Sequence, residues 1–186
     1  MVTGHAAAEP AAAAGPGAAA FLLAQLGAFA GRRFAERVQA LSLTPAHAGL
    51  LRAVGAEPGR SQQAVATHLG LFPSRLVDLV DELERGGLLE RRRDPQDRRH
   101  YALHLTSTGK QRLREIGRLA HAHGEDLLAV LDAHDRAALG RILGRLAEQH
   151  GLAPGVHPGY RTLAAPDDRN SEVARPVTRH TKDPPR

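Results

Sequence analysis

Apolar residues recur every three to five positions through residues 18–151, the spacing that places them on one face of a helix. Capping residues and glycines divide this pattern into separate helices: Thr44 precedes Pro45, Gly70 ends one apolar stripe, and Gly86-Gly87 ends another. The predicted helices run from about Ala18 to Leu41, from Pro45 to the Gly55–Gly59 turn, from the Ser61 cap through Leu69, from Pro73 to Gly86, from Ser107 after the Thr106 cap to about Val130, and from the capping pair Asp132 and Asp135 to Gly151.

The pattern changes to two short strands between the fourth and fifth predicted helices. Leu88–Arg93 and Arg99–Leu105 flank the turn-forming residues 94–98, which predicts a β-hairpin. The element order is therefore α-α-α-α-β-β-α-α, a mainly α chain with a small β-wing. This order favours a winged helix-turn-helix with additional helices at both ends.

Both ends of the chain lack a periodic apolar face. Residues 1–17 are mostly alanine, glycine and proline, and residues 152–186 hold six of the chain's 12 prolines. We expect two disordered tails around a folded domain at residues 18–151, because such segments bury little apolar surface. The apolar stretch 18–30 follows no basic residue and is interrupted by Gln25 and Gly27, so we expect a cytoplasmic protein without a secretory signal or membrane span.

Charge and composition narrow the possible partners. A formal net charge of +5 favours a polyanion such as nucleic acid. The absence of cysteine excludes disulfides, thiol redox sensing and thiolate zinc sites. Aromatic residues make up 3% of the chain and tryptophan is absent, which argues against stacking on single-stranded nucleic acid and leaves duplex DNA.

Arginines are concentrated around the predicted hairpin, where residues 85–99 hold six arginines against three acids. A helix of about 12 residues spans roughly 18 Å and fits the major groove, and a hairpin is thin enough for the adjacent minor groove. The guanidinium group suits the negative potential of a narrow minor groove. The alternative is an arginine-rich solvated surface, but the position directly after a helix-turn-helix favours DNA binding.

Several segments resemble the MarR family of winged-helix regulators, over roughly residues 43–146. The resemblance is carried by Leu69-Gly70, residues 79–84, residues 87–91 (Gly-Leu-Leu-Glu-Arg), residues 94–99 (Asp-Pro-Gln-Asp-Arg-Arg) and residues 105–109 (Leu-Thr-Ser-Thr-Gly). It implies a DNA-binding lobe at about residues 44–106 and an intertwined homodimer held by helices at about 18–41 and 107–150. Each protomer would present one winged helix-turn-helix to a pseudo-palindromic site in double-stranded DNA.

The resemblance also assigns roles to individual residues. In the family's wing an acid orients an arginine that enters the minor groove, which implies this pairing for Asp97 and Arg99. The recognition helix maps to residues 73–84, whose early exposed side chains would meet the major groove. The predicted DNA-binding residues are Ser61, Gln62, Ser74, Arg75, Asp78, Arg92, Arg98 and Arg99, with Asp97 as the wing-orienting residue.

Two features depart from the family pattern. Phe72 stands where a capping serine or threonine is common, so the recognition helix lacks a cap worth about 1 kcal/mol, and Phe72 is expected to pack under the helix instead. Asp78 carries a negative charge on the groove side, and residues 81–82 are also acidic. Asp78 either accepts a hydrogen bond from cytosine N4 or pairs with Arg75 or Arg92.

A small aromatic or anionic effector, bound between the dimer helices and the DNA-binding lobe, is also implied by the resemblance. The candidate lining residues are Phe29, Arg33, His47, Leu51 and His121, with core or helix-surface positions as the alternative.

The chain's 11 histidines do not predict a metal site. His121 and His123 lie about 200° apart around a helix, which is poor chelating geometry. The sequence has no Ser-His-Asp arrangement, phosphate-binding glycine loop or HExxH motif, so it names no catalytic residue, cofactor or enzymatic activity. We therefore expect a homodimeric repressor released by a small molecule. The alternatives are a winged-helix protein-interaction module, favoured by the acidic recognition face, and a metal-responsive regulator.

Overall fold

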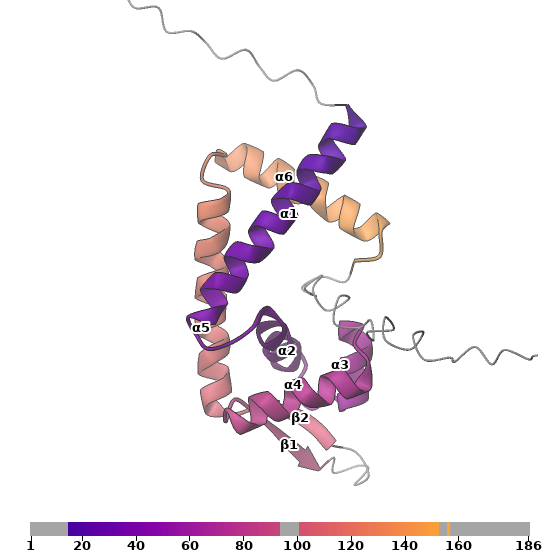
Figure 1. Cartoon of the computed structure of the whole chain (residues 1–186), viewed down its shortest axis with the longest axis vertical. Coiled ribbons are helices and arrows are strands. Elements are labelled where there is room, and N and C mark those ends of the chain that lie inside the picture. Colours follow the sequence, from indigo (N-terminus) through magenta and orange to yellow (C-terminus); the bar gives the residue numbers. More distant parts are fainter. Residues whose placement is uncertain (1–14, 94–100, 153–155, 157–186) are drawn as a thin grey trace, which may run out of the picture.

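The chain folds into helices and one β-hairpin in the predicted order (Figure 1). A computed structural model describes residues 15–93, 101–152 and 156 of the 186-residue chain. The elements within these residues are α1 (Pro16–Gln39), α2 (Pro45–Ala56), α3 (Gln62–Leu69), α4 (Pro73–Arg85), β1 (Leu89–Arg93), β2 (Tyr101–Leu105), α5 (Ser107–Leu127) and α6 (Ala133–Gln149).

Four helices start at the predicted caps. The Thr44 hydroxyl accepts the backbone N–H of His47 at 3.2 Å, and His47 Nδ1 accepts the backbone N–H of Thr44 at 3.3 Å, which completes a capping box. The side chains of Ser61, Thr106 and Asp132 each accept the N–H three residues further on. Because these caps satisfy donors that the first turn of a helix leaves free, they fix the starts of α2, α3, α5 and α6.

The ends of α1 and α5 differ from the prediction. α1 begins at Pro16, inside the segment predicted as a tail, because proline is tolerated in a first turn whose N–H groups have no partner anyway. It ends at Gln39, because Ser42 has a φ of 58°, a left-handed conformation that stops a helix. α5 ends at Leu127, three residues before the predicted Val130, where no glycine or proline marks the boundary.

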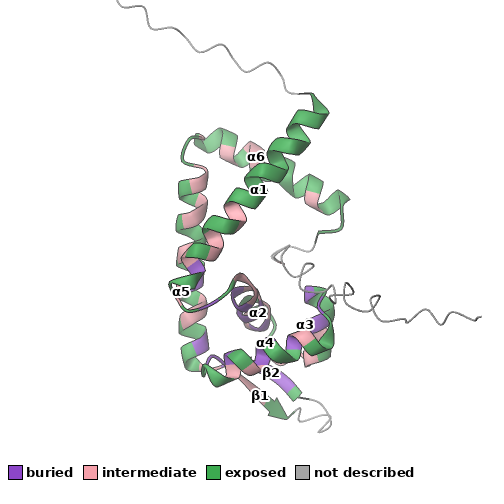
Figure 2. Cartoon of the chain, viewed as in Figure 1, coloured by how far each residue is buried: buried purple, intermediate pink, exposed green. Residues whose placement is uncertain are grey.

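The core lies in the lower lobe, where α2, α3, α4, the hairpin and the first half of α5 pack together (Figures 1 and 2). α4 contributes a complete helical stripe, which consists of Leu76, Leu79, Val80 and Leu83. α2 contributes Leu50, Leu51 and Val54, all nearly inaccessible to solvent. The helix-turn-helix is therefore held by its own apolar faces.

The hairpin is antiparallel and pairs Leu89 with Leu105 and Arg93 with Tyr101. The segment before α3 runs along the other edge of β2: the Gly59 N–H donates to Leu103 O, and the Leu103 N–H donates to Arg60 O, both at 3.0 Å. The base of the hairpin is thus fixed on both sides. The predicted wing tip, residues 94–100, lies outside the described residues.

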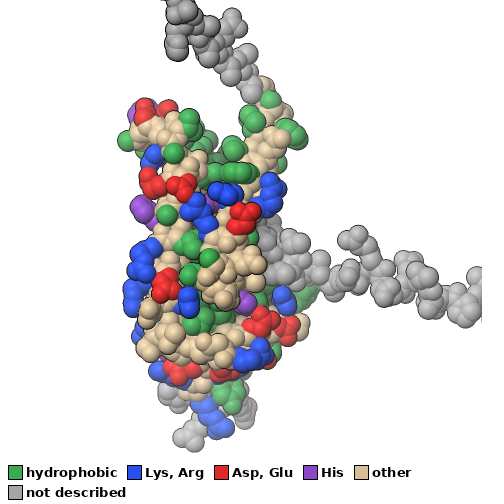
Figure 3. Space-filling view, turned by 60° about the vertical axis from the view of Figure 1, so that its left-hand side comes forward, with side chains coloured by type: hydrophobic (Ala, Val, Ile, Leu, Met, Phe, Trp, Pro, Cys, Tyr) green, Lys and Arg blue, Asp and Glu red, His purple; other side chains and the backbone are tan. Residues whose placement is uncertain are grey.

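The upper half of the molecule exposes apolar side chains. α1 buries only Val38, and α6 buries no residue. The exposed apolar residues of α1 include Phe21, at 65% of its full accessible area, with Leu22, Leu23, Leu26 and Phe29, and those of α6 are Ile142, Leu143 and Leu146. In Figure 3 hydrophobic side chains gather between the arm formed by α1 and the arm formed by the upper end of α5 with α6.

The predicted tails fall almost entirely outside the described residues, so the division at residues 18–151 stays a prediction. In the described segments, no helix combines the length and the apolar character needed to cross a membrane.

Candidate nucleic-acid interface

The outer face of α4 is defined by its buried stripe. Because Leu76, Leu79 and their neighbours point into the core, the side chains of Ser74 and Asp78 are exposed on the opposite face, as predicted. Arg75 lies beside them, and its Nη1 is 3.7 Å from Asp78 Oδ2. Of the two partners proposed for Asp78, the structure therefore selects Arg75.

Phe72 precedes α4 without capping it. No side-chain hydrogen bond is made at this position, as expected. The prediction that Phe72 packs under the helix is wrong, since half of its surface is exposed. Leu71 and Leu76 already occupy the core on either side of the turn, and Pro73 fixes the backbone of the first helical turn.

Arg91 links three elements of the lobe. Its guanidinium group donates to Gln62 on α3 at 2.9 Å and to the carboxylates of Asp81 and Glu84 on α4. Its backbone N–H donates to Glu84 Oε1 at 3.2 Å. Only 19% of the Arg91 side chain is exposed. An arginine of the hairpin thus neutralises two of the acids on the recognition helix.

This role of Arg91 was not predicted: the six arginines of residues 85–99 were described together, and only Arg92, Arg98 and Arg99 were assigned a role, in DNA binding. The alternation of a strand distinguishes them. Arg91 shares a face of β1 with buried Leu89, whereas Arg92 points to the other face. Arg92 is exposed and pairs with Glu90, with Nε to Oε1 at 3.0 Å.

Ser61 and Gln62 have structural partners in addition to their predicted contact with DNA. The Ser61 hydroxyl caps α3 by accepting the Ala64 N–H at 3.2 Å. Gln62 uses its amide oxygen for Arg91. Residues 97–99, which contain the wing-orienting acid and two predicted DNA ligands, lie outside the described residues, so their roles stay predictions.

His47 joins α2 to the recognition helix. Its Nε2 lies 2.8 Å from Glu82 Oε2, and its Nδ1 accepts the Thr44 N–H. The ring hydrogen therefore belongs on Nε2, which donates to Glu82. Glu82, which was expected near the side of the helix that faces the DNA groove, is therefore held against α2 instead.

The five residues proposed for an effector site do not converge. Phe29 and Arg33 are exposed on α1, and Arg33 pairs with Glu36. Leu51 is fully buried in the core, and His121 is exposed on α5. An open cavity of about 590 Å³ instead lies between α1, α2 and α5, and its lining consists of Phe34, Pro45, Ala48, Gly49, Arg52, Leu113, Ile116, Gly117, Ala120 and Val156.

Among the described residues that line this cavity, Arg52 is the only charged one. It follows the core residue Leu51 on α2, and one step along a helix turns the side chain by about 100°, from the core to the cavity. Helical position was the signal that separates the two residues. As for metals, no group of three or more histidine, cysteine, aspartate or glutamate side chains is placed to hold an ion in the described part of the chain. His123 packs its ring against Phe34, with centroids 5.8 Å apart.

Known proteins are similar to this chain in both sequence and fold. The MarR family profile matches residues 41–100. A putative transcriptional regulatory protein for the hcr operon of Thauera aromatica is 35% identical over 131 residues, which make up 70% of this chain and 78% of that protein.

Two solved structures extend the match. The transcriptional repressor CouR, bound to a 23-mer DNA duplex, is 34% identical with a TM-score of 0.62, and the match covers 69% of this chain and 91% of CouR. PcaV from Streptomyces coelicolor, in complex with its natural ligand, is 31% identical with a TM-score of 0.54, and the match covers 76% of this chain and 98% of PcaV. The chain has a winged helix-turn-helix with terminal helices, and its sequence is similar to those of these regulators. It therefore belongs to the MarR family of transcriptional regulators.

Proposed function

We propose that this chain is a homodimeric repressor that binds duplex DNA through α4 and the hairpin and releases it when a small molecule binds. The observation that carries the proposal is the exposed outer face of α4, which presents Ser74, Arg75 and Asp78 at the end of the lobe that also bears the arginine-rich hairpin. CouR, 34% identical, is a repressor bound to DNA in its structure. The proposal includes a cytoplasmic location and no enzymatic activity.

The charges around α4 support DNA binding better than the sequence suggests. Two acids of this helix are bound to Arg91, and Glu82 is bound to His47. Asp78 is the remaining acid on the outer face, and it lies 3.7 Å from Arg75. Arg75 can turn from this exposed pair to a guanine edge or a phosphate, because an ion pair at the surface contributes about 1 kcal/mol or less.

The apolar faces of α1 and α6 support the dimer. A contiguous exposed apolar surface is unfavourable in water, and a second copy of the same chain covers it with self-complementary contacts. The exposed residues of α1 and α6 lie at the end of the molecule opposite the hairpin (Figures 1 and 2). A dimer formed there leaves both α4 helices free for DNA.

The cavity between α1, α2 and α5 supports the effector. Its volume of about 590 Å³ and mainly apolar lining suit a small organic molecule, and Arg52 supplies a partner for a negative group. The cavity lies between a helix of the proposed dimer interface and α2 of the DNA-binding lobe. A ligand that prefers one arrangement of these helices shifts the population toward it.

Fluorescence anisotropy with the chain's own upstream DNA and a scrambled duplex tests DNA binding. We expect Arg75→Ala to weaken specific binding by about tenfold. It should also reduce the slope of the logarithm of the binding constant against the logarithm of salt concentration by roughly one. Arg118→Ala, which removes an exposed arginine of α5 away from the hairpin and α4, is the matched control and should leave both values unchanged. Equal, weak binding to both duplexes that does not change when Arg75 or Arg99 is replaced by alanine would contradict the proposal. It would favour the protein-interaction module.

Asp78→Ala separates two roles of the acid in the same assay. Stronger binding to both duplexes indicates that Asp78 only repels phosphates. A smaller difference between the two duplexes indicates that Asp78 reads a base.

A further inference from the structure

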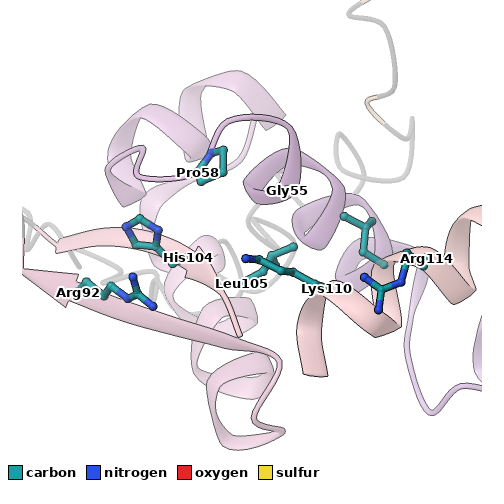
Figure 4. A pocket seen from close by; sticks show the side chains of 8 residues that line it. Gly55, Pro58, Arg92, His104, Leu105, Lys110 and Arg114 are labelled. Atoms are coloured by element: carbon teal, nitrogen blue, oxygen red, sulfur yellow. The ribbon is translucent and has the colours of Figure 1, made fainter. Parts of the chain in front are cut away.

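A second cavity, of about 480 Å³, opens at the base of the hairpin, beside the first turns of α5 (Figure 4). The end of α2, the loop before α3, both strands and the first turns of α5 surround it. Its lining consists of Gly55, Pro58, Arg92, His104, Leu105, Lys110, Leu113 and Arg114. Of the described residues, Leu113 alone lines both cavities.

The lining of this hairpin-base cavity is strongly basic. Among the described residues that line it are three arginine or lysine side chains and one histidine, and none of these described residues is an acid. Arg92 is bound by Glu90, but Lys110, Arg114 and His104 have no ion-pair partner among the described residues. In Figure 4 Lys110 reaches toward the middle of the cavity from α5, and His104 and Arg92 approach it from the strands.

The backbone around the cavity is held in place by hydrogen bonds. The loop that carries Pro58 is tied to β2, because the Gly59 N–H donates to Leu103 O at 3.0 Å. The start of α5 is tied to the segment before β1, because the Thr106 hydroxyl donates to Gly87 O at 2.7 Å. The basic side chains therefore stand on a fixed frame, with Leu105, Leu113 and Pro58 as apolar walls.

We propose that the hairpin-base cavity binds a small organic anion with a flat apolar body and at least two negative charges, carried by phosphate or carboxylate groups. The volume lies within the range of small-molecule sites, about 300–1,000 Å³. Lys110 and Arg114 bind the charged group, His104 donates a ring N–H, and the apolar walls contact the body of the ligand. Because the basic groups come from both the hairpin and α5, the bound anion connects these two elements.

Isothermal titration calorimetry of the full chain with 1-naphthyl phosphate tests the site. This probe has a flat apolar body and a phosphate that carries close to two charges at pH 8. We expect saturable binding at one site per chain, and no binding of 1-naphthol. Each lost charge-assisted contact weakens binding by about tenfold, so Lys110→Gln with Arg114→Gln should weaken it by up to about a hundredfold.

Two controls locate the binding. Arg118→Gln with Arg145→Gln removes the same charge from exposed positions outside the cavity and should change the affinity less than twofold. Arg52→Gln, in the neighbouring cavity, should also leave it unchanged. Circular dichroism and thermal unfolding of each variant show whether it folds like the wild type. The test does not require DNA binding, so its result is independent of the proposed function.

Three results would overturn the proposal. Equal weakening by the two double variants would mean that only net charge attracts the probe. Loss of binding with Arg52→Gln alone would place the probe in the neighbouring cavity. No binding of the probe, together with weaker DNA binding of the Lys110 and Arg114 variant, would mean that the basic cluster contacts DNA phosphates instead.

Discussion

Replacing Gly109 by alanine should destabilise the protein, although alanine is the better helix former. A Cβ atom at Gly109 would lie 1.8 Å from the backbone oxygen of Leu88, whereas Cβ contacts below 3.0 Å essentially do not occur, so the two segments must separate by about 1.2 Å. That shift stretches the cap of α5, in which the Gly109 N–H donates to Thr106 Oγ1 at 2.9 Å, and the contact of the Thr106 N–H with Leu88 O at 3.2 Å.

Three contributions set the magnitude. Overpacking costs about 1–3 kcal/mol, a weakened cap costs about 1 kcal/mol, and the gain from replacing glycine in a helix is at most about 1 kcal/mol. We expect a net loss of about 2 kcal/mol, which lowers the melting temperature by roughly 4–8 °C in a chain of this size.

Gly117→Ala is the matched control, because Gly117 lies in the same helix and nothing approaches its Cβ position within 4 Å. It should stabilise the protein by up to about 1 kcal/mol. Thermal and urea unfolding at one fixed protein concentration measure both variants, since the melting temperature of an oligomer depends on concentration. If Gly109→Ala is as stable as the wild type, the start of α5 does not lie as close to the Leu88 backbone as described.

Three further experiments test features described above. Arg91→Met leaves two carboxylates without their partner and should lower the free energy of unfolding by about 1–3 kcal/mol. Arg91→Lys should recover little of this loss, because one ammonium group cannot reach both acids and Gln62. Urea unfolding that is unchanged in Arg91→Met would contradict this. A double-mutant cycle between His47 and Glu82 should give a coupling energy of about 0.5–1.5 kcal/mol, and additive effects would show that the bond contributes nothing. Leu26→Glu places a charge on the apolar face of α1 and should weaken dimerisation by roughly a hundredfold in sedimentation velocity, whereas an unchanged dimer would move the interface away from α1.

The helix starts could be predicted from the sequence, because capping depends on neighbouring residues. Thr44, Ser61 and Asp132 make the hydrogen bonds that their positions predicted. The partners of charged side chains could not be predicted in this way. Arg91 and Arg92 are adjacent and chemically identical. Strand alternation places them on opposite faces of β1, but only the position of α4 against β1 determines that the face of Arg91 meets two carboxylates.

The effector residues show the same limit. Leu51 and Arg52 are neighbours on α2, and helical position places them on different sides of it. Only the packing of α5 against this helix determines that the side of Arg52 borders a cavity. Phe72 was misplaced because the core positions around the turn were already filled by leucines, which a local pattern does not reveal.

The contacts of Arg91 have a mechanical consequence for regulation. This side chain extends from β1, the strand that leads into the wing, and binds α3 and α4, so its contacts oppose movement of β1 relative to the recognition helix. An effector therefore has little freedom to bend the wing relative to α4. What it can change is the separation of two whole lobes in a dimer, and a mismatch with the helical repeat of DNA of about 34–36 Å is then felt by both half-sites at once.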